Sequence, residues 1–433
     1  MASMAAGMAV ADPAKEATTR FLRSQFHRYY ECTKPTLPDR FGRREFGFMF
    51  WTPGIVQRHL GFSKEEELKD FLVSRVPTHA YYSSAYYDHP NAPTMEEKGW
   101  LGADLVFDLD ADHLPKAASM SYPEMLEAIR LKIVHLYDDF LQSDFGFDPK
   151  TMRLVFSGGR GYHIHVFDER VWSLGSHERR EIVDYVTGKG LEVGSVFRES
   201  AFDRKDFQGH TRVKTRLVAP TSEDPGWRGK IMRGVNGIAA KLEGLSPNEA
   251  IKFLTSFEGV TDADASNLYE NLFKPRATKP RIIRGIDRLR EGQIESLSDR
   301  SRDLIIRLVK ELQPVRDEAQ AGVSLEGIVQ RGETDEPVTS DIKRLIRMPS
   351  SLHGKTGLQV VTLTRGAIDD FRPLRDAVPK TWTDDRIRVN LKNKITMEIR
   401  GEVFNLAPGV NDVPQYLAIF LAARGLATVV PEA

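Results

Sequence analysis

The sequence predicts an α+β protein with a mixed-sheet core into which a mostly helical subdomain is inserted. Apolar and polar residues alternate with the period of half-buried strands in several segments before residue 172, and β-like segments return beyond residue 315. Helical patterns dominate the stretch between them. We therefore expect three parts: residues 1–172, the first part of an α/β core; residues 173–314, the insertion; and residues 315–433, the second part of the core with a C-terminal helix.

The composition is that of an ordinary globular protein. Of 433 residues, 41% are hydrophobic and 28% charged, and the 61 basic residues balance the 61 acidic ones. Because the net charge is zero, a nucleic-acid partner would need a local basic surface. The single cysteine, Cys32, excludes an intrachain disulfide and a cysteine-based zinc cluster. No apolar run is long enough to cross a membrane, and residues 1–11 lack the basic start of a signal peptide, so we expect a cytoplasmic protein.

The elements of the first part follow from periodicity and helix-start signals. A capping box of Ser63 and Glu66 predicts a helix that runs to about Val76. Ser121, with Pro123 and Glu124 behind it, predicts a second capped helix. The helices expected here span residues 14–31, 63–76 and 121–142. The strands expected here span residues 43–51, 80–87, 104–112, 154–156 and 162–167.

The insertion and the last part of the chain are predicted in the same way. Helices are expected at 176–191, 246–257, 262–273 and 298–313, separated by Gly/Pro-containing loops such as 220–229. Beyond the insertion, strands are expected at 359–363 and 387–389, and a last helix at about 413–423. These patterns support the α+β assignment.

The strand at 104–112 carries the first chemical signal. Its apolar residues would face the core, which places Asp108 and Asp110 side by side on the other face. Two such carboxylates repel each other unless a proton or a cation intervenes. Mg²⁺ or Mn²⁺, which prefer oxygen ligands, would remove that repulsion. The alternative is an edge strand with a solvated acidic face.

The glycine-rich turn at 157–161 carries the second signal. Its three glycines allow the backbone N–H groups to approach an anion closely, and Arg160 adds a forked donor suited to phosphate. His163 and His165 would share one face of the strand that follows. The alternative is a hairpin loop with a surface arginine. Zinc binding by the two histidines is disfavoured because no third ligand lies at the usual spacing.

The third signal lies at 335–358. Ile342, Leu345 and Ile346 have helical spacing, so a short helix is expected, and Pro349 would prevent its continuation. Serine, histidine, lysine and threonine donors in the loop that follows could hold a triphosphate. The alternative is a solvated loop after a surface helix. The Lys-Thr-Gly of this loop is not a Walker A motif, because the upstream glycine spacing is absent.

A local basic run at 274–290 is the last feature singled out. It could grip a nucleic-acid backbone. A solvated, charged helix and loop is the commoner explanation, and we favour it. The role of the run stays open at this point.

Taken together, the three motifs in this order resemble the catalytic small subunit of archaeo-eukaryotic DNA primases, in its archaeal form. The resemblance runs from the region of Arg44 and Glu45, whose role it leaves open, to about Gly357. It implies a DNA-directed nucleotidyltransferase that synthesises short RNA primers de novo on single-stranded DNA, with DNA primers as an open alternative. It also implies a large regulatory primase subunit as partner, and ribonucleoside and deoxyribonucleoside triphosphates as substrates.

The resemblance also implies site residues. Asp108, Asp110 and Asp335 would bind two Mg²⁺ or Mn²⁺ ions. Asp335 fits the third position better than Asp341, which falls within the expected helix; Glu333 and Glu336 are its competitors. The residues expected to bind the nucleotide are Ser157, Gly158, Arg160, His163, Arg347, His353 and Lys355.

One feature departs from the family pattern. Many members carry a Cys/His zinc knuckle beside the core, and this chain has no cysteines there, so no structural zinc is expected. Two other function classes remain to be weighed. The same carboxylates could serve a metal-dependent phosphohydrolase or nuclease, or the chain could be a non-enzymatic DNA-binding module.

Overall fold

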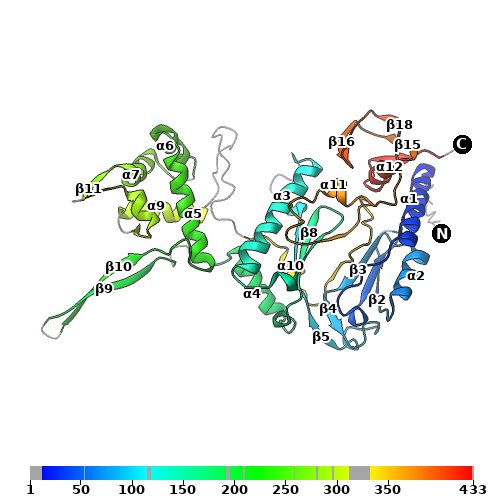
Figure 1. The fold of residues 1–433 in the computed structure, drawn as a ribbon, viewed down its shortest axis with the longest axis horizontal. Coiled ribbons are helices and arrows are strands. Elements are labelled where there is room, and N and C mark those ends of the chain that lie inside the picture. The colour runs from blue at the N-terminus through cyan, green and yellow to red at the C-terminus, as the bar shows by residue number, and fades with distance from the viewer. Residues whose placement is uncertain are drawn as a thin grey trace, which may run out of the picture. The chain divides into compact units, whose positions relative to one another are not determined.

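The computed structural model describes residues 12–52, 54–114, 119–191, 196–207, 210–257, 259–278, 281–294, 297–311 and 332–431. The chain forms two compact units (Figure 1). Unit 1 comprises Met1–Asp138, Gly146–Thr187 and Glu333–Ala433, and unit 2 comprises Asp139–Phe145 and Gly188–Gly332. These units are defined by packing alone, so the predicted three-part division stays a prediction.

The first sheet of unit 1 has the strand order β13-β3-β1-β2. Its strands are β1 (Phe46–Met49), β2 (Val56–Leu60), β3 (His79–Ser83) and β13 (Leu345–Arg347). Helices α1 (Pro13–Cys32) and α2 (Glu65–Arg75) belong to the same unit. Helix α1 begins where the side chain of Asp12 accepts a hydrogen bond from the amide of Ala14, with Pro13 at its first position.

The second sheet of unit 1 has the order β14-β7-β8-β6 and is antiparallel throughout. Its strands are β6 (Leu105–Asp110), β7 (Met152–Phe156), β8 (Gly161–Val166) and β14 (Val361–Leu363). Helix α3 (Tyr122–His135) packs against β8 and β6 (Figure 1). Its buried residues are Leu126, Ile129 and Ile133. The expected capping box is confirmed: the Ser121 hydroxyl accepts from the Glu124 amide, and the Glu124 carboxylate accepts from the Ser121 amide.

Smaller elements complete unit 1. Its remaining helices are α4 (Ser176–Thr187), α10 (Glu336–Ser340), α11 (Pro373–Asp376) and α12 (Gln415–Ala423). Its remaining strands are β4 (Ala85–Tyr87), β5 (Trp100–Ala103), β15 (Arg386–Leu391), β16 (Ile395–Ile399), β17 (Glu402–Leu406), β18 (Gly409–Pro414) and β19 (Ala427–Val429). Strands β4 and β5 pair with each other, as do β16 and β17, whereas β15 lies between β18 and β19.

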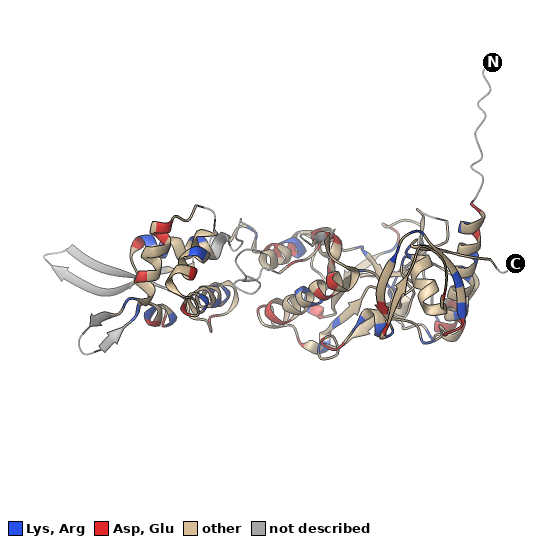
Figure 2. Ribbon diagram, turned by 90° about the horizontal axis from the view of Figure 1, so that it is seen from above, with Lys and Arg blue, Asp and Glu red and all other residues tan. Residues whose placement is uncertain are grey.

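In the described residues of unit 2, five α-helices pack around an apolar core of their own. These are α5 (Gly226–Glu243), α6 (Pro247–Thr255), α7 (Asp262–Phe273), α8 (Gly285–Arg290) and α9 (Asp299–Glu311). Two hairpins accompany them: β9 (Arg198–Phe207) with β10 (His210–Val218), and β11 (Arg276–Thr278) with β12 (Arg281–Ile283). Basic and acidic residues are interspersed along the helices of both units (Figure 2).

Several local predictions were wrong. Residues 220–229 are not all loop, because α5 begins at Gly226. The capping box expected at Ser63 and Glu66 lies one residue later: Lys64 is the N-cap, and the carboxylate of Glu67 accepts from the amides of Ser63 and Lys64. The helix expected at 121–142 is confirmed in its extent, but it is α-helical only to His135 and π-helical over Leu136–Gln142.

Two further corrections concern strands around the first sheet. Residues 80–87 form two strands instead of one, because β3 and β4 enter different sheets on either side of Ser84. The short helix expected through Ile342, Leu345 and Ile346 is absent from the described residues; β13 occupies Leu345–Arg347 and pairs with β3. Pairing with the sheet therefore prevails over a helical spacing of only three apolar residues.

The α+β class is confirmed, since helices and sheets occur in both units. All strand pairs of the described residues are antiparallel, so the sheets are not mixed in strand direction. Within the ranges that the structure describes, no helix combines the length and the apolar character needed to cross a membrane.

Candidate active site

The acidic strand β6 lies at the edge of the second sheet, where β8 is its single partner among the strands that the structure describes. In this register Asp108 is opposite His163, and Asp110 is opposite Gly161. Leu105, Phe107 and Leu109 are buried, as the alternation predicts. The side chains of Asp108 and Asp110 remain 25% and 38% exposed. The strand therefore presents two carboxylates next to the glycine-rich turn.

The carboxylate of Asp108 is held by a histidine of the neighbouring strand. Its Oδ1 lies 3.2 Å from Nε2 of His163. Burial alone would raise the pKa of Asp108, but His163 and the positive charges of Arg344 and Arg347 outweigh it, so the pKa lies below its usual value. Asp108 is thus kept ionised and able to bind a cation.

The structure brings Asp335 to the same strand. Its backbone amide donates to the carbonyl of Asp108 at 2.9 Å, so the turn before α10 covers the open edge of β6. The carboxylate of Asp335 makes no capping hydrogen bond to α10. The two competitors are engaged elsewhere: Glu333 forms an ion pair with Lys132, and Glu336 with Arg180.

Asp341 follows α10 as its C-cap, outside any helix. Its carboxylate accepts a hydrogen bond from the amide of Lys343 at 2.8 Å. The expected helix therefore gives no reason to reject Asp341 as the third carboxylate. Asp335 is still the better candidate, because the carboxylate of Asp341 already accepts the hydrogen bond from Lys343.

The glycine-rich turn packs directly against the loop of the third motif. The hydroxyl of Ser157 accepts from the amides of Gly159 and Gly161, both at 3.3 Å, and so fixes the shape of the turn. Gly158 has a φ of +74°, which favours glycine. A Cβ atom on Gly158 would lie 2.8 Å from Cβ of His353. The close approach of the two motifs therefore requires glycine here.

The third motif is tied to both sheets. A guanidinium N–H of Arg347 lies 2.7 Å from Nδ1 of His79, at the start of β3. The ring of His353 meets that of His79 edge-on, with centroids 4.8 Å apart. The hydroxyl of Thr356 donates to the carbonyl of Gly158 at 2.5 Å. Lys355, between these anchors, is exposed.

The electrostatics of this region favour an anionic ligand. Burial, with the charges of Arg347 and Lys355, lowers the pKa of His79 to about 3. Burial and the same cations also place the pKa of His353 well below its usual value. Both rings are therefore neutral, and the local positive charge comes from lysine and arginine. Arg160 forms an ion pair with Asp112 and lies 3.9 Å from Asp110, so it bridges the turn and the acidic strand.

Residues 107–365 match the family model described as DNA primase small subunit. The chain belongs to this family. The match spans the acidic strand, the glycine-rich turn and the loop of the third motif. The predicted family, and with it the predicted function of a primase small subunit, is thereby confirmed.

Curated relatives agree with the DNA primase assignment over almost the whole chain. A protein of Methanocella arvoryzae is 39% identical over 426 residues, which cover 96% of this chain and 100% of the relative. A protein of Methanothrix thermoacetophila is 40% identical over 418 residues, 95% and 99% of the two chains. A protein of Halobacterium salinarum is 38% identical over 423 residues, 96% and 100%. Each is named DNA primase small subunit PriS.

The carboxylates of this primase subunit do not form a preassembled metal cage. In the part of the chain that the structure describes, no group of three or more His, Cys, Asp or Glu side chains is arranged to hold a metal ion. The oxygen donors of Asp108, Asp110 and Asp335 nevertheless lie on adjoining segments, joined by the amide–carbonyl bond at Asp108. Mg²⁺ commonly takes only one or two protein carboxylates and completes its shell with water and substrate phosphates. The donor set therefore fits such an ion.

Sequence reasoning missed two residues of this candidate site. His79 orients Arg347, and Arg344 contributes to the low pKa of Asp108. A histidine at the start of a strand and one arginine in a charged segment give no local signal. Both become visible only when β13 is paired with β3.

Proposed function

We propose that this chain is the catalytic subunit of a DNA primase that synthesises short RNA primers de novo on single-stranded DNA by two-metal nucleotidyl transfer. The observation that carries the proposal is the backbone bond from Asp335 to Asp108, which brings the third carboxylate to the strand of the first two. DNA primers remain an alternative product. The family name and the three motifs make a nuclease or a purely DNA-binding role less favoured.

Asp108, Asp110 and Asp335 are the residues proposed to hold two Mg²⁺ or Mn²⁺ ions. Their hard oxygen donors suit these cations, and the low pKa of Asp108 keeps it charged at neutral pH. When bound, the ions would activate the attacking 3′-hydroxyl and stabilise the leaving pyrophosphate. His163 would orient the carboxylate of Asp108 through their 3.2 Å contact.

The triphosphate would lie between the turn and the third motif. Arg160, Arg347 and Lys355 supply positive charge there, and the neutral ring of His353 supplies a further donor. His163, which contacts Asp108, lies on the adjoining strand and would complete this side of the site. Ser157 fixes the turn, and Gly158 allows it to pack against His353, so both would shape the phosphate site. All seven predicted nucleotide-binding residues are thus proposed for this role, Ser157 and Gly158 through the backbone.

The relatives are named small subunits, and we propose a large regulatory primase subunit as partner of this chain. Single-stranded DNA would be the template, and ribonucleoside triphosphates, with deoxyribonucleoside triphosphates as an alternative, the substrates. A cytoplasmic location is also proposed, because the relatives are named DNA primase subunits.

Template-dependent incorporation of labelled ribonucleotides, with Mg²⁺ or Mn²⁺, tests the proposal. Asp108→Asn with Asp110→Asn should lower incorporation by at least about 100-fold, because the metal ligands are lost. Asp412→Asn is the control, since this exposed aspartate belongs to the remote strand β18. Unchanged incorporation in the double variant would refute the ligand assignment. Release of mononucleotides instead of polymer would favour the hydrolase alternative.

A further inference from the structure

Helix α4 reaches both segments that carry the proposed metal ligands. Arg179 is buried and donates to the carbonyls of Ala103 at 2.8 Å and Asp104 at 2.7 Å, just before β6. The next residue, Arg180, forms a 3.0 Å ion pair with Glu336, the first residue of α10. Two consecutive arginines thus join α4 to the acidic strand and to the helix that follows Asp335.

A second ion pair holds the other side of Asp335. Lys132 of α3 pairs with Glu333, two residues before Asp335. Asp335 therefore lies between two acids, each bound to a different helix of unit 1. Its own amide is bound to Asp108. This pattern fixes the backbone around Asp335 at three points and leaves its carboxylate available.

The two ion pairs lie where the chain passes between the units. The longer segment of unit 2 begins at Gly188, directly after α4, and ends at Gly332, directly before Glu333. All four side chains are between 31% and 48% exposed, and exposed ion pairs contribute little to folding stability. Their placement around Asp335 therefore matters for position more than for stability.

We propose that Lys132 and Arg180 are positioning residues for the primase reaction. Through Glu333 and Glu336 they hold the backbone of Asp335 beside β6, so that its carboxylate joins those of Asp108 and Asp110 around a divalent cation. This inference rests on the proposed function, because it gives Asp335 the role of a metal ligand. It adds that two helices, α3 and α4, hold the segment around Asp335 where the chain returns to unit 1.

The test is Mn²⁺ binding to the full chain without substrates, measured by electron paramagnetic resonance, alongside nucleotide incorporation. Arg180→Glu and Lys132→Glu should each raise the Mn²⁺ dissociation constant by about 10-fold, the scale of losing a residue that orients a metal ligand. They should lower kcat more than they raise KM for the nucleotide. The double variant Arg180→Glu/Glu336→Arg restores the ion pair with reversed charges and should recover most of the loss.

Arg386→Glu is the matched control, because Arg386 forms an exposed ion pair with Asp412 in another sheet. It should leave Mn²⁺ binding and incorporation unchanged. Wild-type Mn²⁺ binding in Arg180→Glu and Lys132→Glu, with weakened binding in Asp335→Asn, would overturn the positioning role alone. Failure of the reversed pair to recover binding would overturn it as well. Wild-type binding and incorporation in Asp335→Asn would instead refute the proposed ligand set.

Discussion

Substituting Gly161 by alanine should disturb the proposed metal site through sterics alone. A Cβ atom on Gly161 would lie 2.3 Å from the carbonyl oxygen of Leu109 and 3.1 Å from Cα of Asp110. Both neighbours are backbone atoms of β6, so no side chain can rotate away. The strands must open by at least 0.7 Å to reach the 3.0 Å below which such contacts essentially never occur. Overpacking of this kind costs about 1–3 kcal/mol.

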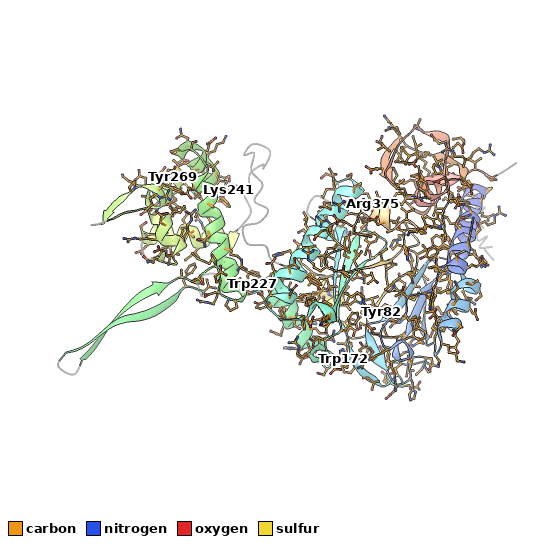
Figure 3. The ribbon with its side chains drawn as sticks, in the orientation of Figure 1. Tyr82, Trp172, Trp227, Lys241, Tyr269 and Arg375 are labelled. Carbon is orange, nitrogen blue, oxygen red and sulfur yellow. The ribbon has the colours of Figure 1, made fainter. Side chains whose placement is uncertain are left out.

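The same displacement moves Asp110, which pairs with Gly161 in the sheet. A shift of about 1 Å in a catalytic group can cost about 100-fold in rate, so incorporation by Gly161→Ala should fall by about this factor. Urea unfolding, monitored by tryptophan fluorescence, measures mainly the stability of unit 1. Four of the five tryptophans, among them Trp172, lie in this unit, whereas Trp227 lies in unit 2 (Figure 3). The four in unit 1 are Trp51, Trp100, Trp172 and Trp382.

The control is Gly366→Ala, in the same unit, where an added Cβ would meet no atom within 4 Å. Its stability should change by less than about 1 kcal/mol, and its activity should stay that of the wild type. If Gly161→Ala equals Gly366→Ala in both measurements, the close packing of β8 against β6 does not position Asp110, and the steric reasoning fails.

Three further variants test individual contacts by urea unfolding. The pKa of His79 is lowered to about 3, so below about pH 6.5 the unfolded chain takes up a proton that the folded chain does not, and the free energy of unfolding falls as pH falls. Between pH 7 and pH 5, His79→Asn should lose about 2 kcal/mol less of its unfolding free energy than the wild type. An equal loss in both proteins would contradict this. Arg44→Met leaves the carboxylate of Asp104 buried without its 2.6 Å partner and should cost about 3–5 kcal/mol, whereas a cost below about 1 kcal/mol would show that the ion pair is not needed. Ser121→Ala removes the cap of α3 and should cost about 1 kcal/mol, and no change would mean that water replaces the cap.

Sequence patterns within one segment predicted those helices and strands whose structure depends mainly on contacts within that segment. Helix α7 was predicted at 262–273 and occupies these residues, because a run of apolar residues with helical spacing follows the cap at Thr261. The acidic strand was predicted from alternation, and Leu105, Phe107 and Leu109 are buried as expected, although Val106 on the opposite face is buried as well. In both cases the pattern spans enough residues to outweigh competing contacts.

Elements that depend on distant partners were less predictable. The spacing of Ile342, Leu345 and Ile346 indicated a helix, but the partner strand of Leu345–Arg347 is β3, far away in the sequence. The hairpin Arg198–Phe207 with His210–Val218 was missed because its many charged residues mask any alternation. The contact between His79 and Arg347 was missed for the same reason as β13, since it exists only across the sheet.

The edge of β6 has a consequence for how the protein is made. Asp335 leaves the ribosome more than two hundred residues after Asp108, and the whole of unit 2 is synthesised between them. At about 5–20 residues per second this interval lasts about 11–45 s. During it, the backbone carbonyl of Asp108 lacks the amide that later covers it, and an uncovered strand edge is a template for pairing with other chains. The backbone bond that brings Asp335 to the other proposed metal ligands therefore also covers this part of the strand edge in the newly made chain.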